Sequence, residues 1–98
     1  MEAPSEPSTL ILASLAAETR HGHAIMRDIE EFARVRLGPG TLYGALQRLE
    51  RAGLIEAVPS TDRRQPYRLT AAGTSALSAR LEAYGRVLRA AEHRLDGR

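Results

Sequence analysis

The C-terminal segment places apolar side chains at helical spacing over a length that one small domain cannot cover. From about Ala71 to Leu95, apolar residues recur in steps of 4, 3, 4, 3 and 4, the seam of a heptad repeat. These positions are Leu77, Leu81, Tyr84, Leu88, Ala91 and Leu95. A helix of this length spans roughly 38 Å at 1.5 Å per residue. The chain has 98 residues, enough for a single core. We therefore expect residues 71–98 to form a dimerisation helix.

The alternative is that this helix folds back on its own subunit. Leu77 is close enough to the rest of the chain to do so, whereas Leu88 and Leu95 lie about 16 to 27 Å beyond it at helical rise. Leaving such side chains in water would forfeit roughly 1.5–3 kcal/mol for each large one. This cost favours pairing with a second copy of the chain.

Three shorter helices are predicted before this segment. Ser8 or Thr9 can cap the first, which continues to about Ala17. The second runs over about 22–34, with an apolar stripe at helical spacing, and the third over 39–52. That stripe consists of Ile25, Met26, Ile29, Phe32 and Ala33. Residues 1–8 contain two prolines and no periodicity, so we expect a disordered arm there.

After Gly53 the period changes from helix to strand. Short strands are predicted at 54–58 and 67–70, joined by a polar tip at 59–66 that carries Arg63 and Arg64. Two strands alone are only marginally stable, so this hairpin must pack on the helices. The predicted fold is mostly α with a small β-hairpin: a winged helix-turn-helix domain over 9–70, followed by the long helix.

In that architecture the third helix enters the DNA major groove and the hairpin, or wing, reaches the backbone. Helix 39–52 carries polar and basic side chains opposite its apolar face, at Thr41, Tyr43, Gln47, Arg48 and Arg51. All 14 basic residues are arginine, whose planar fork suits phosphate and guanine, although a GC-rich coding sequence would also favour arginine. The net charge of +2 is too small to decide the matter. A solvated helix face is the competing interpretation.

Several motifs resemble the PadR family of bacterial transcriptional regulators over about residues 10–95. They are His21-Gly22, Pro39-Gly40-Thr41-Leu42-Tyr43, Ala45-Leu46, Arg48-Leu49-Glu50, Gly53-Leu54-Ile55 and Tyr67-Arg68-Leu69-Thr70-Ala71-Ala72-Gly73. The single C-terminal helix is similar to the family's short subfamily. The resemblance implies a homodimeric repressor of a pseudo-palindromic DNA operator, released by a small-molecule effector whose identity is unknown.

The resemblance also assigns roles to individual residues. Thr41 and Tyr43 match positions expected to hold phosphates, and Arg63 and Arg64 lie in the family's basic wing, with Arg68 as a further candidate. The chain departs from the family pattern in three places. Gly44 replaces a usual proline, Gly38 replaces a usual serine, and the wing contains Pro66 in place of glycine and a fuller basic run.

Other chemistry has little support in the sequence. Cysteine is absent, and His21 and His23 are two apart on a predicted helix, so they do not face one another as metal ligands. We expect no enzyme activity, no metal and no cofactor. Tyr84 and Phe32 are the aromatic candidates for an effector pocket, although both are expected in the core. With no membrane span or signal peptide apparent, a cytoplasmic protein is expected.

A different class of function stays open at this point. A winged helix can also serve as a protein-interaction module without specific DNA binding. The near-neutral charge and the acidic outer face of the second helix, with Asp28, Glu30 and Glu31, favour that alternative. Salt-sensitive retention on promoter DNA distinguishes the two.

Overall fold

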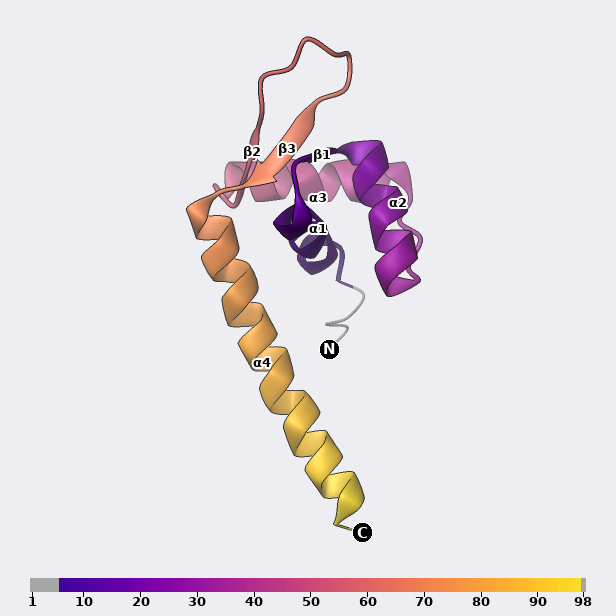
Figure 1. Ribbon diagram of the computed structural model, residues 1–98, viewed down its shortest axis with the longest axis vertical. Coiled ribbons are helices and arrows are strands. Elements are labelled where there is room, and N and C mark those ends of the chain that lie inside the picture. Colours follow the sequence, from indigo (N-terminus) through magenta and orange to yellow (C-terminus); the bar gives the residue numbers. More distant parts are fainter. Residues whose placement is uncertain (1–5, 98) are drawn as a thin grey trace.

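The computed structural model describes residues 6–97 and extends over 57 × 26 × 20 Å. Three helices and a small sheet form one end, and a fourth helix leaves that end as a long arm (Figure 1). The elements are α1 (Pro7–Ala17), β1 (Arg20–His21), α2 (Gly22–Ala33), α3 (Pro39–Arg51), β2 (Ile55–Ala57), β3 (Pro66–Leu69) and α4 (Ala71–Asp96). The predicted mostly α fold with a small hairpin is confirmed.

Helix α1 is the centre of the core. It is apolar on most sides, and it packs against α2, α3, β3 and α4. Its Ile11 and Leu12 are completely buried, together with Ile25 and Ile29 of α2. The remaining core is supplied mainly by α3, through Leu42, Ala45, Leu46 and Leu49. These contacts fix the position of α3, whose opposite face stays free.

The start of α1 differs from the prediction. The helix begins at Pro7 with Glu6 at the N-cap, so neither Ser8 nor Thr9 caps it, and the arm predicted at 1–8 ends by residue 6. Proline suits the first helical turn because its fixed φ is helical and its missing N–H would have no partner there. The rest of the predicted arm, residues 1–5, lies outside the described residues.

The sheet has three strands in place of the predicted two. All pairs are antiparallel in the order β1-β3-β2, with Arg20 opposite Tyr67 and Ile55 opposite Leu69. The segment between the first two predicted helices therefore includes β1. Two residues are too few to give an alternating pattern, which is why the sequence did not indicate this strand. The extra strand joins the base of the wing to the start of α2.

The hairpin follows α3 as predicted, but its strands cover 55–57 and 66–69 in place of 54–58 and 67–70, so Pro66 begins β3 and does not belong to the tip. Gly53 follows the end of α3 with a φ of 77°, in the left-handed region that glycine adopts without strain. Thr70 caps α4, its hydroxyl accepting a hydrogen bond from the Gly73 N–H at 3.0 Å. A Cβ on Gly73 would overlap the carbonyl oxygen of Leu54, so α4 starts in direct contact with the chain that enters β2.

Beyond its first turns, α4 leaves the core. Leu77 is 7% exposed and belongs to the core of its own subunit, which corrects its assignment to a dimer interface. The alternative that the sequence left open, folding back, holds for this residue. Leu81, Leu88 and Leu95 are 54%, 59% and 62% exposed. Tyr84 falls between Leu81 and Leu88 but is half-buried, with its hydroxyl 3.4 Å from Thr9 Oγ1 and from Glu6 Oε2.

The buried stripe of α2 is narrower than predicted. Ile25 and Ile29 are fully buried, and Met26 and Ala33 are partly buried. Phe32, predicted to lie in the core, is 50% exposed. It lies at the last turn of α2, before Arg34 turns the chain in a left-handed conformation with a φ of 58°. Ala33, the next residue, still packs against the core, so Phe32 lies at the edge of the buried stripe.

Candidate nucleic-acid interface

The exposed face of α3 carries all five of the helix residues predicted to contact DNA. Thr41, Tyr43, Gln47, Arg48 and Arg51 are each exposed. The buried residues of α3 face the core on the other side, so these five share the free surface of the helix. None of their side chains is needed to complete the core. The structure thus leaves hydroxyl, amide and guanidinium groups together on one accessible helix face.

Gly40 and Gly44 leave part of the α3 backbone on this face uncovered by side chains. A Cβ at Gly40 would meet nothing within 4 Å, so packing within the subunit does not require glycine there. A Cβ at Gly44 would meet only the Arg48 guanidinium, at 3.5 Å. The guanidinium of Arg48 therefore lies beside the position where the family's proline usually stands. Small side chains at 40 and 44 permit another molecule to approach the backbone of α3 closely.

Tyr43 connects α3 to the start of α2. Its ring lies against Gly22, where a Cβ would come within 2.7 Å of the tyrosine hydroxyl. Only glycine fits at this position with the tyrosine as it stands. This contact explains why the two motifs His21-Gly22 and Pro39-Gly40-Thr41-Leu42-Tyr43 occur together, because each supplies one side of it. The tyrosine remains 49% exposed.

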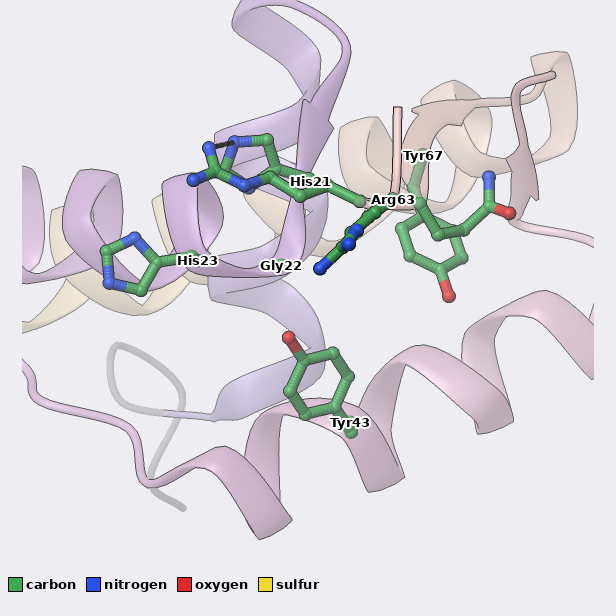
Figure 2. A pocket seen from close by; sticks show the side chains of 8 residues that line it. His21, Gly22, His23, Tyr43, Arg63 and Tyr67 are labelled. Atoms are coloured by element: carbon green, nitrogen blue, oxygen red, sulfur yellow. Dashed lines mark hydrogen bonds between the residues drawn. The ribbon is translucent and has the colours of Figure 1, made fainter. Parts of the chain in front are cut away.

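A cleft of about 490 Å³ joins α3 to the wing. It is lined by the start of α2, by Tyr43 of α3 and by wing residues, and Figure 2 shows Arg63 and the Tyr43 hydroxyl directed into the same space. The lining residues are His21, Gly22, His23, Tyr43, Arg63, Arg64, Gln65 and Tyr67. No carboxylate is among these eight described residues. The structure thus brings together the wing arginines and Tyr43, which are about twenty residues apart in the sequence.

The wing is held at its base by Gln65. Its side-chain amide donates to the Val58 carbonyl at 2.9 Å and to the Pro66 carbonyl at 2.8 Å, closing the loop between the two strands. Arg63 and Arg64 are exposed beyond this point, and among the described residues neither guanidinium forms an ion pair with a carboxylate. Their charge is therefore not neutralised within the described part of the subunit.

Arg68 is placed differently from the other candidates. It is exposed on β3, but its Nε donates to Glu56 Oε1 at 2.7 Å, across the β2–β3 pair. It does not line the cleft. The antiparallel register puts Glu56 directly opposite Arg68, and opposite charges on facing strand positions attract. Its charge is already partly compensated, unlike that of Arg63 or Arg64.

His21 is the site residue that sequence reasoning missed. It is the N-cap of α2, with Nδ1 accepting a hydrogen bond from the Ala24 N–H at 3.3 Å, and its Nε2 lies 3.2 Å from Nη1 of Arg64.

Tyr67 also lines this cleft. Partial burial, with the Glu50 carboxylate nearby, raises the pKa of the Tyr67 hydroxyl above its ordinary value of about 10, so it stays neutral at physiological pH.

Residues 6–97 hold neither a metal site nor a membrane span. No grouping of three histidine, aspartate or glutamate side chains in this part of the chain could bind a metal ion. None of the helices described is sufficiently long and apolar to pass through a membrane.

Comparison with known proteins adds a family match over most of the chain. Residues 11–79 match the model of the transcriptional regulator PadR-like family. The chain belongs to this family. An uncharacterized 37.1 kDa protein of a Streptomyces fradiae transposon is 39% identical over 83 residues, which is 85% of this chain but 24% of that protein. The PadR-like chain thus spans about a quarter of the length of this relative.

Solved structures give the same result for the fold. A PadR family transcription regulator from Clostridium difficile superimposes with a TM-score of 0.81 at 26% identity, covering 90% of this chain and 96% of that one. A PadR-like transcription factor from Bacteroides fragilis gives a TM-score of 0.74 at 30% identity, with 88% and 86% covered. These findings confirm the winged-helix fold and the resemblance noted from sequence. They support a DNA-binding regulator, and regulators of the PadR family are generally not enzymes.

Proposed function

We propose that this PadR-like chain is a homodimeric, sequence-specific repressor that inserts α3 into the DNA major groove and places wing residues 59–66 on the backbone. The observation that carries the proposal is the free face of α3, which continues through Tyr43 into the arginine-lined cleft at the wing. A recognition helix and a wing that act on one duplex need such a continuous surface. A solvated helix face would not need the neighbouring cleft to be free of carboxylates.

Within this surface the side chains divide by their chemistry. Gln47, Arg48 and Arg51 are long enough to reach base edges, and arginine forms a bidentate pair with guanine. Thr41 and Tyr43 lie at the start of α3, where hydroxyls and free N–H groups suit a phosphate. Arg63 and Arg64 would contact the backbone without reading sequence. Arg68 ranks last among these candidates because Glu56 already partners it.

The apolar seam of α4 supplies the second half of the proposal. Leu81, Leu88 and Leu95 stay more than half exposed in the single subunit, together with Val87 at 55%, which was not among the seam positions chosen from sequence. Tyr84 and Ala91 extend the same stripe. Pairing two copies about a two-fold axis would cover it, and would present two copies of α3 to a pseudo-palindromic operator. The family resemblance adds release by a small-molecule effector.

A protein-interaction module is the second candidate function. It is favoured by the exposed Phe32 near the exposed acidic residues Glu30 and Glu31 on α2. Salt-sensitive retention of the protein on promoter DNA supports the repressor, since DNA binding releases counterions. Retention that is absent at low salt supports the module.

Replacing Arg48 by alanine tests the proposed function. Binding to the DNA upstream of the chain's own coding region should weaken by about 1–3 kcal/mol, the value of one bidentate pair with a base. A gel-shift titration measures the change. Arg86→Ala is the matched control, because Arg86 is exposed on α4, the helix that leaves the core as a long arm (Figure 1), and its removal takes away the same charge. Equal affinities of R48A and R86A would remove Arg48 from the interface.

A further inference from the structure

His21 contacts two groups that can only donate, the Ala24 N–H and the Arg64 guanidinium. Nδ1 of His21 faces the Ala24 N–H at 3.3 Å, and Nε2 faces Nη1 of Arg64 at 3.2 Å. A neutral imidazole has one accepting nitrogen and one N–H, whereas a backbone N–H and a guanidinium can only donate. At most one of the two contacts can therefore be a hydrogen bond. The other is left as two donors side by side.

The N-cap of α2 determines which of the two His21 contacts is not a hydrogen bond. If Nδ1 accepts from the start of α2, the proton of the neutral ring lies on Nε2 and points toward the guanidinium. Protonating the ring does not remove the conflict, because imidazolium donates from both nitrogens and so forgoes the cap as well. It would also place a third positive charge beside Arg63 and Arg64, and like charges repel. The arrangement therefore favours the neutral ring with a free Nε2–H.

The lining of the cleft around this donor pair holds no acceptor of opposite charge. The ionisable side chains that face it across the cleft are Arg63 of the wing, His23 of α2, Tyr43 of α3 and Tyr67 of β3. The Tyr43 hydroxyl and Arg63 point into the same space (Figure 2), and His21 and Arg64 line the same cleft. An oxyanion placed there would accept from several donors at once, and charge-assisted hydrogen bonds of this kind are the strong ones.

We infer that neutral His21, donating from Nε2, and Arg64 together hold one phosphodiester oxyanion of the DNA backbone in the cleft between α2, α3 and the wing. This inference rests on the proposed DNA-binding function and adds a contact that the candidate residues of α3 and the wing did not include. It also gives His21 two separate tasks, since Nδ1 caps α2 and Nε2 contacts the ligand.

The test separates these two tasks with His21→Ser. Serine is a good N-cap, so α2 should stay intact, but its hydroxyl cannot reach the position of Nε2. Fluorescence anisotropy with a labelled duplex, at a pH of about 8, should give about tenfold weaker binding for H21S. The weakening should be equal on the upstream DNA and on a duplex of mixed sequence, because phosphate contacts carry no sequence information. Arg86→Ala should bind as the wild type does.

The salt dependence distinguishes the neutral donor from a charged one. Arg64→Ala removes a cation from the phosphate, so it should lower the slope of log K against log salt by about one. H21S should leave that slope as it is in the wild type, because no cation is removed. A slope reduced equally in both variants would show that histidine binds as a cation, and would overturn the neutral-donor assignment.

The remaining outcomes are also decisive. If H21S binds DNA as tightly as the wild type does, this inference is contradicted, while the proposed function stays in place. No salt-sensitive DNA binding by the wild type would contradict the proposed function, and this inference with it. If inorganic phosphate protects the wild type but not H21S from thermal unfolding, while DNA binding is equal, the site takes a free anion and the assignment to the DNA backbone is wrong.

Discussion

Helices α1 and α4 are both rich in apolar residues, but they differ in what covers them. In α1, six of the 11 residues are buried, because α2, α3, β3 and α4 surround it. In α4, only Gly73 and Leu77 are buried among 26 residues. The seam beyond Leu77 continues with the same spacing after the core has ended. An apolar pattern therefore predicts a buried face without saying which molecule buries it.

Breaking the α4 seam should give the largest effect. Leu88→Asp combined with Leu95→Asp puts four charges into a symmetric dimer interface and removes four leucine side chains, each worth roughly 1.5–3 kcal/mol when buried. We expect the dimer dissociation constant to rise by about a thousandfold or more, while the subunit stays folded. Analytical ultracentrifugation measures the dissociation constant, and circular dichroism checks the fold.

The matched control for this change lies on the opposite side of α4. Ala79→Asp combined with Arg86→Gln alters the charge of α4 by the same amount at exposed positions off the seam. It should leave the dimer unchanged. A dimer that survives the leucine changes, or that dissociates equally in the control, would show that α4 is not paired through this seam.

A smaller effect is expected where α4 is anchored to the core. Gly73→Ala puts a methyl group where the Leu54 carbonyl stands, so the backbone of β2 or α4 must shift. We expect a decrease of about 3 kcal/mol in the free energy of unfolding, at the upper end for overpacking. Chemical denaturation at a fixed protein concentration measures it.

Gly85→Ala in the same helix sharpens the comparison. A Cβ there meets only the end of the flexible Arg89 side chain, so alanine should be tolerated and should favour the helix by up to about 1 kcal/mol. Destabilisation by both changes to the same extent would mean that close contact with the core does not distinguish the start of α4 from its middle.

The smallest effect is expected where α1 meets α4. Tyr84→Phe removes a hydroxyl that lies 3.4 Å from Thr9 Oγ1 and from Glu6 Oε2, while keeping the ring. Because both hydrogen bonds are long and partly in water, we expect a decrease of no more than about 1 kcal/mol in unfolding free energy. Thermal melting checks the change. A decrease as large as that of Gly73→Ala would place Tyr84 among the principal anchors of α4.

Sequence periodicity was sufficient to predict the helices, the hairpin and the exposed face of α3. It could not predict β1, whose two residues are stabilised by pairing with β3, more than forty positions away in the sequence. Phe32 was misplaced because it lies at the edge of the apolar stripe of α2, and helical spacing alone does not show how wide the buried part of that stripe is. The role of Leu77 likewise depends on where the rest of the chain lies.

The candidate site was less predictable than the fold. Arg48 and Arg51 could be found from one helix, but the chemistry of His21 depends on Arg64, which is 43 residues later and reaches it through the fold of the wing. The pairing of Glu56 with Arg68 could have been anticipated, since the short hairpin places the two positions opposite one another. The contact between Gly22 and Tyr43 was visible only as two separate motifs.

A footprint on the DNA upstream of the chain's own coding region tests the central claim most directly. If two copies of α3 are presented by a dimer joined through α4, the wild type should protect two half-sites whose centres lie about one helical turn apart, or a whole multiple of it. Protection of a single half-site would contradict a two-fold recognition surface on α3. So would the absence of any protected site together with DNA binding that does not depend on salt.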